Sequence, residues 1–113
     1  MAFIPATKET ILTTDETPVT RDVAVSTGMY YFQALARTGT DMKAWMLFVA
    51  FKKNEGIVSV LGDATPAVID GLGDAGLADA TVSIETNADN ARIVLTGIAD
   101  TEIEWKISFK QEM

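Results

Sequence analysis

The chain contains no cysteine and no histidine, and these two absences exclude several kinds of protein chemistry. Without cysteine no disulfide can form, so stability must come from packing, strand pairing or association with other subunits. Without either residue, the common zinc sites lose their ligands and the usual catalytic triads and dyads lose their general base. We therefore expect no catalytic residues, no metal site and no cofactor, and predict that the chain is not an enzyme.

Positive charge is also scarce, because 9 basic side chains stand against 16 acidic ones and the net charge is −7. Such a surface repels the phosphate backbone of nucleic acids and anionic membrane surfaces. No apolar run approaches the roughly 20 residues that a transmembrane helix needs, and residues 1–8 lack the pattern of a signal peptide. The sequence therefore predicts neither a nucleic-acid-binding nor a membrane protein.

The most regular feature is alternation of apolar and polar residues, which predicts half-buried strands. From Glu102 to Lys110, every second residue is apolar, and Trp105 belongs to that apolar set. We expect Trp105 in the core and Glu102 on the solvated face, where a charge-balanced surface explains the acidic residues better than a glycosidase-like carboxylate pair. Residues 92–96 alternate similarly, and the short turn at 97–101 predicts an antiparallel hairpin between the two segments.

The segment Met42–Lys53 is apolar on both of its faces. A helix is the competing interpretation, since several of its residues are good helix formers. We favour a strand because the segment ends at a turn-forming Asn54-Glu55-Gly56. A doubly apolar strand is either central in its sheet or turns one face to another subunit. The candidate subunit contacts on this strand are Trp45, Leu47, Val49 and Phe51.

About eight short strands with turns at regular spacing predict an all-β fold, an antiparallel β-sandwich or jelly roll. We assign residues 11–113 to this single domain and residues 1–10 to an N-terminal arm. In the arm, Phe3 and Ile4 are either frayed or anchored on a neighbouring subunit. Residues 62–79 form a long loop rich in glycine and aspartate, with a short strand at 67–69. Its aspartates fit turns better than an ion site, because their spacing matches neither an EF-hand nor a glycine-rich nonapeptide calcium repeat.

Three segments, taken together, resemble a small β domain of tailed-bacteriophage virion proteins. They are Thr13-Thr14-Asp15-Glu16-Thr17-Pro18, Thr40-Asp41-Met42-Lys43-Ala44-Trp45, and the run from Asn90 to Trp105 that reads NARIVLTGIADTEIEW. Each segment alone is ordinary strand-and-turn chemistry, so the resemblance rests on their order and spacing. It extends from about Ile11 to Phe109.

The resemblance implies a structural role in a virion, and it carries no catalytic residues. Domains of this family occur in tail-fibre, neck and head-associated proteins, often as one module of a longer chain. Because the module here stands nearly alone behind a short arm, we expect a capsid decoration (cement) protein. Its partners would be the major capsid protein or other virion proteins, and the family's modules are often trimeric. The alternative is a tail, collar or fibre module that binds a receptor. Either way, the expected location is the virion, assembled in the host cytoplasm.

Overall fold

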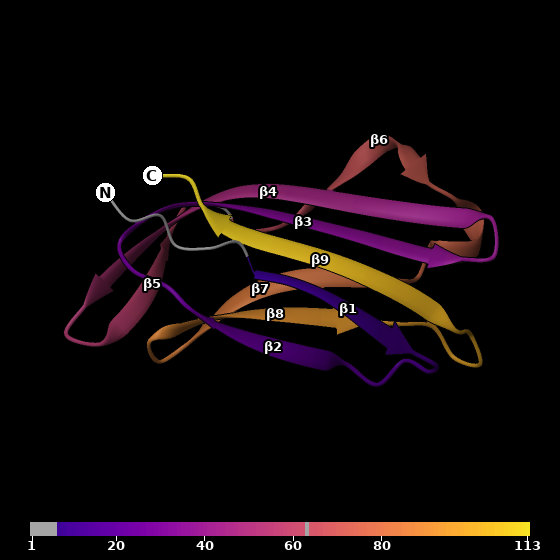
Figure 1. The fold of residues 1–113 in the computed structure, drawn as a ribbon, viewed down its shortest axis with the longest axis horizontal. Helices are drawn as coiled ribbons and strands as arrows, with labels where there is room; N and C mark the ends of the chain where they lie inside the picture. The colour runs from indigo at the N-terminus through magenta and orange to yellow at the C-terminus, as the bar shows by residue number, and fades with distance from the viewer. Residues whose placement is uncertain (1–6, 63) are drawn as a thin grey trace.

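The protein folds into two antiparallel β-sheets packed face to face, as a computed structural model describes for residues 7–62 and 64–113 (Figure 1). The predicted all-β sandwich is confirmed, whereas the jelly roll is not. The strands are β1 Thr7–Thr13, β2 Val19–Ala24, β3 Gly28–Thr38, β4 Asp41–Asn54, β5 Ile57–Leu61, β6 Ala67–Gly73, β7 Thr81–Asn87, β8 Asn90–Thr96 and β9 Ile103–Gln111, with one 3-10 helix, η1, at Ala75–Leu77.

The two sheets differ in size. The large sheet has the order β1-β9-β3-β4-β5, and β6 also pairs with β4. The small sheet has the order β2-β8-β7. Every pairing is antiparallel. Every strand except β6 turns its alternate apolar residues toward the space between the sheets, where the core lies.

The hairpin predicted between residues 92–96 and 102–110 is wrong, because β8 belongs to the small sheet and β9 to the large one. Both strands bury their apolar residues in the same core, but from opposite sides. Alternation reports which face is buried and is silent on whether successive strands pair or face each other. The crossing begins at Gly97, where a Cβ atom would lie only 2.6 Å from the backbone oxygen of Asp15.

Two tryptophans fill the centre of the sandwich because β3 carries small residues opposite them. Ala34 pairs with Trp45 on β4, and Ala36 pairs with Trp105 on β9. The two indole rings stack with centroids 5.5 Å apart and planes 21° apart, an arrangement that favours aromatic pairs. Trp105 is fully buried, as predicted.

The Trp105 indole also makes the sandwich's main buried polar contact. Its Nε1–H donates to Oγ1 of Thr13 at 2.9 Å. Thr13 is the one polar side chain found buried among residues 8–62, 64–69 and 71–113. This hydrogen bond satisfies the donor that burial of tryptophan would otherwise leave without a partner.

Three segments can be compared with the sequence-based expectations. The segment predicted from Met42 to Lys53 is indeed a strand, β4. The large sheet already begins at Thr7, so residues 7–10 of the predicted arm lie in β1, while residues 1–6 lie outside the described residues. The long loop predicted at 62–79 contains the expected short strand, which extends to Gly73 as β6, and the helix η1.

Candidate functional site

The face of β4 that was expected to contact other subunits points into the core, and the opposite face of the strand points outward. Trp45, Val49 and Phe51 are buried in the core of the single chain, and Leu47 packs against that core. The small sheet already covers this face, so these four residues are not free to bind another subunit. The other two candidates, Phe3 and Ile4, lie outside the described residues.

The alternate residues of β4 form an exposed surface, which we call the apolar patch. It consists of Met29, Tyr31, Met46, Phe48, Ala50 and Leu61, from β3, β4 and β5. The register makes these residues neighbours: Met29 pairs with Ala50, Tyr31 with Phe48, and Ala50 with Leu61. The Tyr31 and Phe48 rings lie 4.4 Å apart, yet Phe48 remains 57% exposed. Contiguous exposed apolar surface of this kind marks interaction sites.

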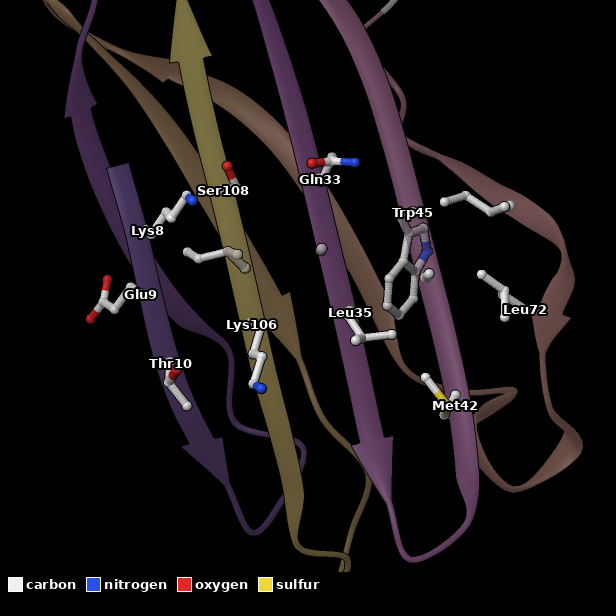
Figure 2. Close-up of a pocket in the computed structure, with 14 residues that line it drawn as sticks. Lys8, Glu9, Thr10, Gln33, Leu35, Met42, Trp45, Leu72, Lys106 and Ser108 are labelled. Atoms are coloured by element: carbon white, nitrogen blue, oxygen red, sulfur yellow. The ribbon is translucent and has the colours of Figure 1, made fainter. Parts of the chain in front are cut away.

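A groove of about 710 Å³ continues the apolar patch along the outer face of the large sheet (Figure 2). Its floor is formed by outward side chains of β9, β3 and β4, including Lys106, Leu35 and Ala44. Ile69 and Leu72 of β6 border it on the far side. Figure 2 shows Lys8 and Thr10 on β1 at one side of the groove and Leu72 on β6 at the other side.

The wall of the groove exists because β6 leaves the sheet between its two points of pairing. Val68 pairs with Trp45, and Gly73 pairs with Lys43. One residue of β4 therefore stands opposite the four residues 69–72, which arch away from the sheet as Figure 1 shows. Gly71, with φ of 81°, allows the reversal in this arch.

The loop after β6 is tied back to β4, which fixes the end of the wall. The Asp74 carboxylate accepts a hydrogen bond from the Met42 backbone N–H at 2.8 Å, and the Asp74 N–H donates to the Met42 carbonyl at 3.0 Å. The Lys43 ammonium donates to the carbonyl oxygens of Ala78 and Ala80. Asp74 thus acts as a structural turn residue, as expected for the aspartates of this segment.

Three lysines gather on the β1–β9 side of the groove. Lys8 stands opposite Ser108, so it is the diagonal neighbour of both Lys106 and Lys110 on the same face. The Lys110 ammonium pairs with Glu112 at 3.1 Å. Lys8 and Lys106 form no ion pair within the described part of the chain. Two adjacent ammonium groups without a counter-ion attract an anion.

The small sheet carries the opposite charge on its outer face. Asp22 and Glu85 flank Arg92 there, because both pair with it across β8. The Arg92 guanidinium donates to Asp22 at 2.8 Å, and this hydrogen bond lowers the pKa of the Asp22 carboxyl from its ordinary value. The two faces of the sandwich therefore differ in charge as well as in apolar surface.

Neither a metal centre nor a spanning helix is found in the part of the chain that the structure describes. Among these residues no three metal-ligating side chains come together, and none of their helices is long and apolar enough to cross a membrane. Their aromatic side chains all lie in strands, so none stands on a described loop at the end of the sandwich.

The sequence gives a signal for the exposed face that the expectation overlooked. One set of β4 residues contains two aromatics, Trp45 and Phe51, whereas the other contains a single aromatic, Phe48, and two small alanines. The larger aromatic set indicates the core face.

Comparisons with protein families, with curated proteins and with solved structures found no match to this chain.

Proposed function

We propose that this protein is a structural component of a tailed-phage virion, a capsid decoration protein that binds and stabilises the head. The apolar patch is the observation that carries the proposal. Met29, Phe48 and Leu61 expose large apolar side chains beside one another on a broad sheet face. Such a surface suits burial against another protein.

The resemblance of the sequence to phage virion domains supplies the class of partner, namely the major capsid protein or another virion protein. A hydrogen-bonded sheet presents the patch on a preformed backbone, so binding orders little more than the side chains, which favours affinity. In this proposal the protein acts by binding alone and catalyses no reaction. A trimer is the oligomer that the resemblance suggests.

Placement in a tail, collar or fibre is the alternative outcome. A receptor-binding module would display aromatic side chains on loops at one end. The described loops carry none, and this favours docking on a capsid.

Sedimentation of the purified protein with undecorated heads of the parent phage tests the proposal. We expect co-sedimentation that saturates at a fixed number of copies per head. Failure to co-sediment would contradict decoration, and a glycan-binding screen would then test the receptor-binding alternative.

A further inference from the structure

We infer that the groove binds an extended, acidic segment of a partner protein, placing an apolar side chain against the β6 wall and a carboxylate between Lys8 and Lys106. The inference deepens the proposed function by naming the chemistry of the partner. It depends on that function only for the partner's identity as a virion protein.

The charge distribution argues for an acidic partner. Four of the nine basic residues lie on the outer face of β1, β3 and β9, although the whole chain has a net charge of −7. These residues are Lys8, Arg37, Lys106 and Lys110. The acidic side chains beside them are already engaged, since Glu104 pairs with Arg37 and Glu112 with Lys110. Glu9, which also borders the groove, is held by Arg21 at 2.8 Å.

The apolar half of the groove argues for a protein segment rather than a simple anion. A row across the sheet runs from Lys106 through Leu35 to Ala44, because these residues are paired in register. Beyond this row stand Ile69 and Leu72 of β6. An inorganic anion would use only the lysines and leave this apolar surface in water, whereas a peptide side chain would cover it.

The geometry also predicts the spacing of the two anchors. Three strand separations lie between β9 and β6, and together they measure about 14 Å. An extended chain advances about 3.3 Å per residue. A segment crossing the strands would therefore carry its large apolar residue about four positions from its acidic residue.

A second copy of this chain fits the groove less well. Face-to-face pairing through the large sheet would add the lysines of one copy to those of the other. The outer face of the small sheet is a poor substitute as the acidic partner, since Asp22 there is bound to Arg92 and Glu85 stands beside the same guanidinium. A partner with free carboxylates matches the groove better.

Selection from a random 12-residue peptide display library tests the inference. We expect the enriched peptides to carry an aspartate or glutamate about four positions from a large apolar residue. Synthetic copies of these peptides, followed by fluorescence anisotropy, should lose about tenfold or more in affinity for the Lys8→Glu/Lys106→Glu variant. The same loss is expected for Leu72→Asp.

Matched controls distinguish the groove from general effects of charge and polarity. Lys52→Glu/Lys53→Glu makes the same charge change at exposed positions outside the groove, and Ile57→Asp places the same acid at another exposed apolar residue. Both controls should bind the peptides like the unmodified chain. Circular dichroism and thermal unfolding of each variant verify that it is folded.

Several results would overturn the inference. The first two concern the peptides: enriched sequences without acidic residues, or equal affinity of the peptides for the groove variants and their controls. The other two concern a different occupant: self-association of the chain that Lys8→Glu/Lys106→Glu abolishes, or binding to phosphatidylserine vesicles that depends on these two lysines. Heads that still co-sediment fully with Lys8→Glu/Lys106→Glu would also overturn it, yet would leave the decoration proposal standing. Loss of co-sedimentation for the unmodified chain would instead refute the proposed function.

Discussion

Removing the hydroxyl of Thr13 should destabilise the fold even though the side chain keeps its size. In Thr13→Val a methyl group replaces Oγ1, which accepts the hydrogen bond from Trp105 Nε1 at 2.9 Å. Both residues are buried, so water cannot replace the lost acceptor. A buried donor left without a partner costs about 1–3 kcal/mol. We expect the free energy of unfolding to fall by that amount.

Urea denaturation followed by tryptophan fluorescence measures this change, because both tryptophans remain in the variant. The slope of the unfolding free energy against urea should stay the same, since the surface exposed on unfolding is unchanged. Thr14→Val is the matched control, as Thr14 is the next residue and is exposed. Its effect should stay within about 0.5 kcal/mol.

A double-mutant cycle isolates the hydrogen bond itself. Trp105→Phe removes the donor, so Thr13→Val should cost less in that background than in the unmodified chain. The two substitutions should be coupled by about 0.5–3 kcal/mol, as expected for residues in direct contact. A loss below about 0.5 kcal/mol for Thr13→Val alone, or strict additivity in the cycle, would refute the role given to this contact.

Two further predictions concern the core and the small sheet. Trp105→Ala should lower the free energy of unfolding by about 3–5 kcal/mol, because it empties a fully buried site; a loss below about 1 kcal/mol by urea denaturation would contradict that burial. The pKa of the Asp22 carboxyl, measured in an NMR pH series, should lie below the ordinary value of an aspartate, and Arg92→Met should raise it toward that value. Because folding lowers this pKa, the contact stabilises the fold above the unfolded-state pKa, and this contribution is lost as pH falls through the folded-state value. An Asp22 pKa unchanged by Arg92→Met would exclude Arg92 as the cause.

The strand pattern of the sequence was sufficient for the fold class but not for the pairing of strands. Alternation around Trp105 located the core face of β9, since a period of two residues directly reports burial. The same pattern, together with the short turn at 97–101, suggested a β8–β9 hairpin, because strands that face each other across a core alternate just as paired strands do. The chain crosses from one sheet to the other at Gly97, which packs tightly against Thr13 and Asp15. These contacts join residues far apart in the chain, so the local sequence does not reveal them.

The candidate site was predicted in part. The doubly apolar character of β4 predicted a strand that is either central or turns one face to another subunit. β4 is central in its sheet, and its exposed face carries Phe48 rather than Trp45. The groove could not be read from the sequence. Its wall depends on the arch of β6 between Val68 and Gly73, and its lysine cluster depends on the register of β1 against β9. Both are long-range features with no local sequence signal.

The most direct test of the account is the binding of two aspartate variants to undecorated heads. Phe48→Asp places a charge at the centre of the apolar patch, and Ile57→Asp places one at an apolar residue outside it; the two side chains are 57% and 66% exposed. The account predicts that Phe48→Asp no longer co-sediments with heads, whereas Ile57→Asp saturates them at the same copy number as the unmodified protein. Equal binding of the two folded variants would contradict the account.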